Sequence, residues 1–279
     1  MLNPILKLWY KIFNKNQYRD LKDEKRTEEN VKYYNSRIYN QILEIQKKIE
    51  NNKELSFLHS GHMGDLIYSL ATIKEISKTR KCKLYIQVDK PMPVDYSVSS
   101  RKVYLSKRLG ELFLPLLKSQ DFLDTVNIYK DEKIDINLDL FRDIPINHSF
   151  YSSRWFSHIC GININVENTF LSVRPHELIK NKIIVGRSLR YRNAYINYKF
   201  LKNTKNLLCI GLKDEFQDSK KDINNLEFHD CKDFLEMAEI IKASFEFFPK
   251  TRQLITNNSI TNNSSPRLWE RISIILLYS

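Results

Sequence analysis

The chain has 279 residues, enough for one large domain or two ordinary ones, and 42% of them are hydrophobic, enough to form a core. Its low content of glycine (6) and proline (8) excludes collagen-like and broadly disordered classes. The net charge of +12 favours anionic partners such as nucleotides, nucleic acid or acidic lipids, although a lysine-rich solvated surface gives the same balance.

Residues 1–53 are expected to form an N-terminal helical segment. Within residues 1–19, apolar side chains alternate with Lys7, Lys11, Lys15 and Arg19, which fits a basic helix lying on a membrane surface, a helix docked on its own domain, or a frayed end. Residues 20–53 have helical spacing without Gly or Pro and predict one long helix. No run is long enough to span a membrane and no cleavage site follows the N-terminus, so we expect a cytoplasmic protein. Docking or fraying of residues 1–19 is the favoured alternative, and peripheral membrane contact through them stays open.

Residues 54–180 predict a first α/β unit. The run Leu55–His59 predicts its first strand, and a turn holding Gly61, Gly64 and Asp65 leads into an amphipathic helix. Further strands are predicted at Leu84–Val88, Val126–Tyr129 and Ile134–Leu138, and further helices at Arg108–Lys118 and Ser149–Cys160.

Residues 181–248 repeat this alternation. Strands are predicted at Lys182–Gly186, Asn206–Gly211 and Phe245–Phe248, with a helix at Asp233–Ala243. The fold class expected is therefore α/β, with two Rossmann-like halves. The second half should be incomplete, because residues 186–248 supply fewer elements than a doubly wound half normally has. Residues 249–279 form a divergent tail, rich in Asn at first and apolar at its end.

The first glycine corner holds the main candidate residues. Asp65 suits either a general base that accepts a proton from a sugar hydroxyl or a cap for the free N–H groups of the helix. Gly61 and Gly64 would let the backbone approach a ligand, or would simply form a tight turn. His59 and His62 have a spacing that could suit a metal, but without a further ligand cluster they are expected to be polar loop residues, and we predict no metal site. The four cysteines lie far apart without C-x-x-C spacing, which also argues against zinc.

Two further clusters follow the predicted strands of the second half. Arg187, Arg190 and Arg192 crowd one loop, where their guanidinium groups would bind a diphosphate or simply be solvated. Glu215 follows Gly211 closely, and its carboxylate would either accept hydrogen bonds from ribose hydroxyls or cap the next helix.

At Ser60–Lys74, Val185–Asn193 and Phe234–Ser244 the chain resembles the heptosyltransferase-like glycosyltransferases of glycosyltransferase family 9. The resemblance implies a GT-B fold and metal-independent transfer of a sugar from a nucleotide-diphosphate donor to a glycan hydroxyl, with inversion and without a cofactor. It also implies that Asp65 is the base, that Gly61, His62 and Gly64 border the substrate, that Arg187, Arg190 and Arg192 hold the diphosphate, and that Glu215 lies near the nucleoside.

The resemblance stops abruptly after Phe248. The family has an Asn/Asp-Ser-Gly-type loop there, whereas this chain continues Pro249-Lys-Thr-Arg-Gln-Leu-Ile-Thr-Asn257. A truncation or frameshift would produce this change, so the leading hypothesis is a glycosyltransferase-like protein of polysaccharide biosynthesis that has lost part of its donor site. The alternative hypothesis is a non-catalytic nucleotide- or polyanion-binding module. Specific nucleic-acid binding is not expected, because neither a helix-turn-helix pattern nor zinc-finger spacing is found.

Overall fold

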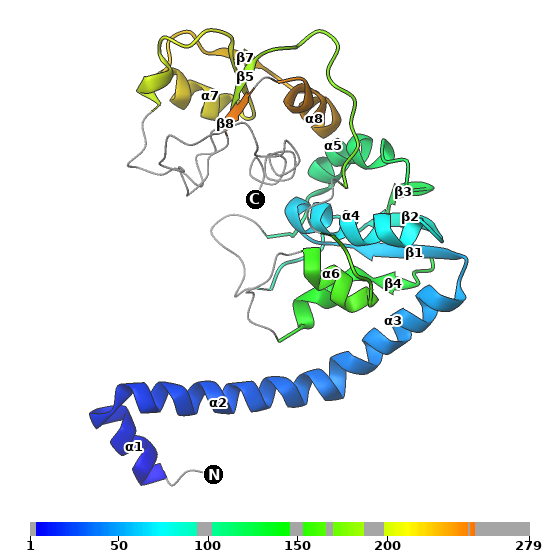
Figure 1. Cartoon of the computed structure of the whole chain (residues 1–279), viewed down its shortest axis with the longest axis vertical. Helices are drawn as coiled ribbons and strands as arrows, with labels where there is room; N and C mark the ends of the chain where they lie inside the picture. Colours follow the sequence, from blue (N-terminus) through cyan, green and yellow to red (C-terminus); the bar gives the residue numbers. More distant parts are fainter. Residues whose placement is uncertain are drawn as a thin grey trace.

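Two parallel β-sheets with covering helices, preceded by a series of N-terminal helices, make up the computed structural model (Figure 1). The structure describes residues 4–93, 102–145, 153–165, 170–186, 198–244 and 246–248. The predicted α/β fold class is confirmed, and the tail at 249–279 lies outside the described residues.

The first sheet has four parallel strands in the order β3-β2-β1-β4. Its strands are β1 (Glu54–His59), β2 (Lys81–Ile86), β3 (Thr125–Ile128) and β4 (Ile136–Asn137). Its helices are α4 (Met63–Ser77), α5 (Lys107–Lys118) and α6 (Ser153–Cys160). β2 begins three residues earlier than predicted, and β4 is short because the chain turns directly into a 3-10 helix, η3 (Leu138–Asp143).

The second sheet repeats the same order. Its strands are β5 (Ile183–Val185), β6 (Leu207–Ile210), β7 (Glu227–His229) and β8 (Glu246–Phe248), arranged β7-β6-β5-β8 and all parallel. Its helices are η4 (Lys199–Leu201), α7 (Lys213–Lys220) and α8 (Phe234–Ala243). Counted from its own first strand, each sheet has the order 3-2-1-4, the arrangement of a Rossmann half. β7 was not predicted, because its residues Glu-Phe-His include only one apolar side chain.

The two halves share a hydrophobic core. One continuous buried cluster joins the first sheet to Ile184, Leu208 and α8 of the second half. At this contact the ring of Phe113 on α5 meets Phe234 on α8 edge-on, with centroids 5.6 Å apart. A separate cluster covers the other face of the second sheet. Its buried members are Val185, Tyr198, Leu201, Leu207, Cys209, Phe216, Ile223 and Leu226.

The N-terminal helices run away from this core. They are α1 (Pro4–Phe13), α2 (Lys15–Tyr33), a π-helical segment η1 (Tyr34–Ile38) and α3 (Tyr39–Asn51). The single helix predicted over 20–53 is therefore interrupted by η1, and its last part packs on the first half through Ile38 of η1 and through Ile42, Ile45 and Ile49 of α3. Figure 1 shows α2 leading away from both sheets, with α1 at its far end. Among the described residues, none of the helices combines the length and apolarity needed to cross a bilayer.

Candidate functional site

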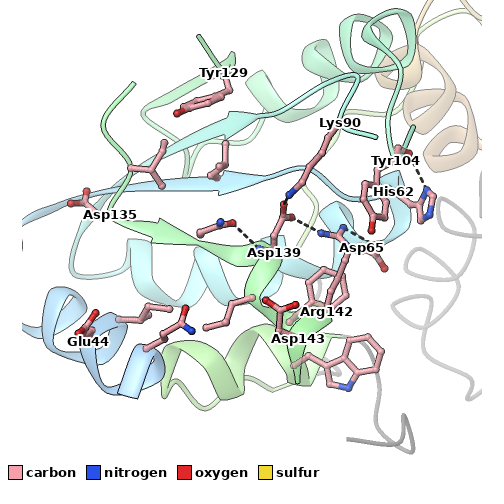
Figure 2. Close-up of a pocket in the computed structure, with 18 of the residues that line it drawn as sticks. Glu44, His62, Asp65, Lys90, Tyr104, Tyr129, Asp135, Asp139, Arg142 and Asp143 are labelled. Carbon is pink, nitrogen blue, oxygen red and sulfur yellow. Dashed lines mark hydrogen bonds and ion pairs between the residues drawn. The ribbon is translucent and has the colours of Figure 1, made fainter. Parts of the chain in front are cut away.

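A cavity of about 790 Å³ opens at the carboxyl ends of β1, β2 and β4 and extends to α3 (Figure 2). β2 and β4 lie on opposite sides of β1, so the chain reverses its direction of winding at this point of the sheet. Open α/β sheets bind ligands at such switch points. The charged residues lining the cavity are Glu44, Lys48, Asp65, Lys90, Glu132, Asp135, Asp139, Arg142 and Asp143.

Asp65 lines this cavity from the first turn of α4. The N-cap position belongs to His62, whose Nδ1 lies 3.0 Å from the carbonyl oxygen of Tyr104. The Asp65 side chain is 26% exposed, and its Oδ2 lies 3.9 Å from Nη2 of Arg142. Asp65 and His62 therefore line the same cavity, and Arg142, which is distant in sequence, lies beside Asp65 as a basic partner.

Gly61 makes room for other protein groups. A Cβ atom at this position would overlap Nη2 of Arg142 and lie 2.5 Å from Cε1 of His59. The Gly61 N–H also donates to Nδ1 of His59 at 2.8 Å. Gly64 is buried within α4, and its side of the helix faces the core. The glycine at 61 therefore has a packing reason that is independent of any ligand.

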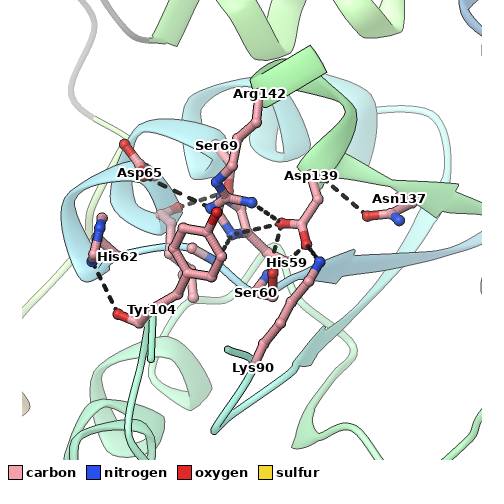
Figure 3. Close-up of polar contacts among 12 residues, drawn as sticks. His59, Ser60, His62, Asp65, Ser69, Lys90, Tyr104, Asn137, Asp139 and Arg142 are labelled. Atoms are coloured by element: carbon pink, nitrogen blue, oxygen red, sulfur yellow. Dashed lines mark hydrogen bonds and ion pairs between the residues drawn. The ribbon is translucent and has the colours of Figure 1, made fainter. Parts of the chain in front are cut away.

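Asp139 is the centre of a buried polar network (Figure 3). This residue of η3 is only 7% exposed and accepts hydrogen bonds from both the backbone N–H (2.9 Å) and the hydroxyl of Ser60. Lys90 and Arg142 each form an ion pair with it at 2.7 Å, one at each carboxylate oxygen. The side chain of Asn137 in turn accepts the backbone N–H of Asp139 at 3.0 Å. These contacts fix the end of β4 against the end of β1.

The protonation states of the network follow from its burial. Burial opposes the charged form of Asp139, but the positive charge and hydrogen bonds around it, from Arg142 and Lys90 among others, hold the pKa of its carboxyl below the usual range. Complete burial lowers the pKa of His59 to about 3, so its ring is neutral at pH 7. Since Nδ1 accepts a hydrogen bond from Gly61, the proton lies on Nε2, which has no hydrogen-bond partner in the described part of the chain.

Arg142 is held between aromatic rings. Its guanidinium carbon lies 4.4 Å from the ring centroid of Tyr104 and 4.5 Å from that of Phe141. One of its nitrogens, Nη1, pairs with Asp139. The other, Nη2, is buried without a hydrogen bond among the described residues and is the atom nearest to Asp65. Trp155 stacks on Phe141 at 5.7 Å and adds a further ring to the cavity wall. Stacking and ion pairing together fix the guanidinium in one orientation.

Three of these residues were not identified from the sequence: Lys90, Asp139 and Arg142. A usable signal existed for two of them, because Asp139 and Arg142 directly follow the run predicted as the fourth strand, and polar residues at the carboxyl ends of parallel strands converge on one edge. Nothing in the sequence indicated that this strand lies beside the first one rather than at the far edge.

The second half places its candidate residues differently. Arg187, Arg190 and Arg192 lie outside the described residues. Glu215 is in the first turn of α7, where its Oε2 accepts the backbone N–H of Leu212 at 3.2 Å. Glu215 does not line the cavity of the first half. Its described contact is that of a helix cap.

A second cluster of metal-ligating types lies in the same half. Ligand atoms of His229, Cys231 and Glu236 come within 4.8 Å of one another. The carboxylate of Glu236 is already engaged, since Oε2 accepts the N–H of Lys232 at 2.7 Å and Oε1 lies 3.1 Å from Nε2 of His229. Burial raises the pKa of the Cys231 thiol to about 12, which favours the neutral thiol over the thiolate that metals bind. The carboxylate of the cluster is therefore engaged by its own neighbours and the thiol is held in the form that does not bind metal.

Comparisons with known proteins give little further information. No family model matches the chain, and no curated protein is similar enough to count as a relative. One similar solved structure is a glycosyl transferase family 9 protein from Veillonella parvula DSM 2008, with a TM-score of 0.43 and 8% identity over 70% of this chain and 74% of that chain. A likeness at this level does not establish a family, so the fold assignment rests on the strand order of the two sheets.

Proposed function

We propose that this protein is a glycosyltransferase that moves a sugar from a nucleotide-diphosphate donor to a hydroxyl group of a glycan, with Asp65 as the general base. The observation that carries the proposal is the position of Asp65, an acid on the wall of a cavity at the switch point of a Rossmann-like sheet. The ion pair with Arg142 orients the carboxylate, and Arg142 is itself fixed by Asp139 and two rings.

The proposed reaction is metal-independent. The Asp65 carboxylate takes the proton of the acceptor hydroxyl while the oxygen attacks the anomeric carbon. The bond from that carbon to the diphosphate breaks on the opposite face, and the nucleoside diphosphate leaves with the electron pair. The anomeric configuration is therefore inverted. Arg187, Arg190 and Arg192 remain the proposed diphosphate ligands, and Glu215 the proposed neighbour of the nucleoside.

The composition of the cavity favours an uncharged polyhydroxylated acceptor. Its lining holds six acidic residues against three lysines and arginines, in contrast to the net charge of +12 of the whole chain. Two of those three cations are already paired with Asp139. The rings of Trp155, Phe141 and Tyr104 offer apolar faces for sugar rings, and the carboxylates of the lining offer hydrogen-bond acceptors for hydroxyls.

The alternative proposal, a non-catalytic nucleotide- or polyanion-binding module, finds less support in this cavity. An anionic polymer would meet an excess of carboxylates there, and such charges repel it. Binding of a polyanion elsewhere on the basic surface would weaken steeply as salt is raised, whereas binding of a nucleotide sugar at one site would saturate. A salt titration with a homopolymer and with single nucleotide sugars separates the two functions.

Release of nucleoside diphosphate from a panel of nucleotide sugars tests the catalytic proposal. We expect Asp65→Asn to lower turnover by about 10²–10⁴-fold, the usual contribution of a general base. Asp143→Asn is the matched control, because this exposed carboxylate lines the same cavity without contacting Asp65 in any described interaction. Unchanged turnover in Asp65→Asn would exclude the base role. Binding of a nucleotide sugar without turnover would fit a copy that lost activity, and the absence of both binding and turnover would contradict the proposal.

A further inference from the structure

Helix α1 carries an apolar face that the rest of the described chain leaves uncovered. Trp9 and Phe13, one helical turn apart, are 50% and 71% exposed. The other large exposed residues of this helix are Leu6, Leu8 and Ile12. At 100° per residue all five fall on one side of α1, whereas Lys7 and Lys11 fall on the opposite side. α1 is therefore strongly amphipathic, with its apolar side toward solvent.

The charge around this helix has one sign. The segment 4–19 contains Lys7, Lys11, Lys15 and Arg19 and no Asp or Glu, and the first acid of the chain is Asp20. Farther along α2, acids and bases alternate. The positive charge is thus concentrated on α1 and the first turns of α2, beside the exposed rings. This combination of aromatic, aliphatic and lysine side chains is typical of helices that lie in a membrane interface.

The position of α1 suits such a role. Figure 1 shows it at the far end of α2, away from both sheets, so docking on the body of the protein does not cover its apolar face. α2 buries none of its own residues. α2 is a rod roughly 28 Å long at 1.5 Å per residue and would separate the two sheets from the surface that α1 binds.

We propose that α1 binds the surface of an anionic lipid bilayer, with Trp9 and Phe13 in the boundary between headgroups and acyl chains and the four basic residues at the lipid phosphates. A second copy of the chain is a poorer occupant, because a ten-residue helix about 15 Å long offers much less than the roughly 800 Å² per partner of a standard interface. The adjoining α2 is charged along most of its length, and its exposed large apolar residues, Val31 and Tyr33, lie at the end away from α1.

Vesicle flotation with the full-length protein tests this proposal. Vesicles of phosphatidylcholine alone are compared with vesicles of equal parts phosphatidylcholine and phosphatidylglycerol. We expect binding to the mixed vesicles, with loss of about tenfold or more in Trp9→Ser/Phe13→Ser. Lys7→Gln/Lys11→Gln should lose about 25-fold, because each basic residue near an anionic surface contributes about fivefold.

Matched variants on α2 control for general surface effects. Val31→Ser/Tyr33→Ser removes exposed apolar groups, and Lys22→Gln/Lys32→Gln removes the same charge as the α1 variant. Both should bind within about twofold of the wild type. Absence of vesicle binding, equal binding to the uncharged vesicles, or equal losses in the α2 variants would each overturn the proposal. A concentration-dependent dimer in sedimentation velocity that Trp9→Ser/Phe13→Ser abolishes, without vesicle binding, would assign the face to a second copy instead.

This proposal and the glycosyltransferase proposal can fail separately. Asp65→Asn should leave vesicle binding unchanged, because Asp65 lies on α4 and not on the rod. Trp9→Ser/Phe13→Ser should in turn leave the turnover of soluble substrates unchanged. A circular dichroism spectrum and a melting curve for each variant confirm that the fold is kept.

Discussion

The two halves of this molecule have the same strand order but different chemistry at their strand ends. In the first half, Asp139 follows a strand and is buried in a network with Lys90, Arg142 and Ser60. In the second half, Glu215 also follows a strand closely, and its described hydrogen bond caps its own helix. A shared topology therefore provides the same edge twice, and the residues placed on each edge decide its chemistry.

The largest expected difference between the halves is in the cost of removing these acids. Asp139→Asn should lower the free energy of unfolding by about 3 kcal/mol, because it leaves two cations without their buried partner. Glu215→Gln, the matched change in the second half, should cost less than about 1 kcal/mol, since a half-exposed cap is lost. Urea unfolding at pH 7 measures both values. Equal costs would mean that the network of Asp139 adds nothing beyond an ordinary surface contact.

The pH dependence of stability sharpens the same comparison. His59 is neutral in the folded protein, with a pKa of about 3, whereas an unfolded histidine titrates near 6.5. Between these values the unfolded state binds the extra proton, so stability is lost as the pH falls from 6.5 toward 3. The loss from His59 alone should be about 2 kcal/mol between pH 7 and pH 5. The lowered pKa of Asp139 adds a further loss only below about pH 4.

Histidine variants assign that loss to the first half. His59→Gln should remove most of the slope between pH 7 and pH 5 in urea unfolding, whatever its effect on stability at pH 7. His229→Gln serves as the control in the second half, because that ring is partly exposed and lies beside Glu236. A slope that persists in His59→Gln would show that another group causes the loss.

A third expected effect concerns Gly61. Gly61→Ala should destabilise the fold by about 1–3 kcal/mol, because its Cβ has no room beside Arg142 and His59. Arg142→Met in the same chain should recover part of that cost, which a double-mutant cycle measures. A neutral Gly61→Ala would mean that the guanidinium can move aside, and the close packing at this corner would then be unnecessary for stability.

Much of the fold followed from local patterns. The apolar run at Leu55–His59, the glycine corner and the helical stripe after Asp65 predict β1, the turn and α4, and the repeat of strands and helices after residue 180 predicts the second half. Strand β7 was not predicted, because its three residues include only one apolar side chain. The interruption of the long N-terminal helix at η1 was not predicted, because a π-helical segment leaves the spacing of apolar residues nearly unchanged.

The sequence by itself determined the two α/β halves, the acid at the first corner and the basic amphipathic helix at the N-terminus, because each depends on residues close together in the chain. Only the tertiary structure decided that Asp139 and Arg142 meet Ser60 and Asp65, and that α1 keeps its apolar face uncovered. The reason is physical: strand pairing sets β4 beside β1 across 79 positions of sequence, and no local period encodes which strands become neighbours.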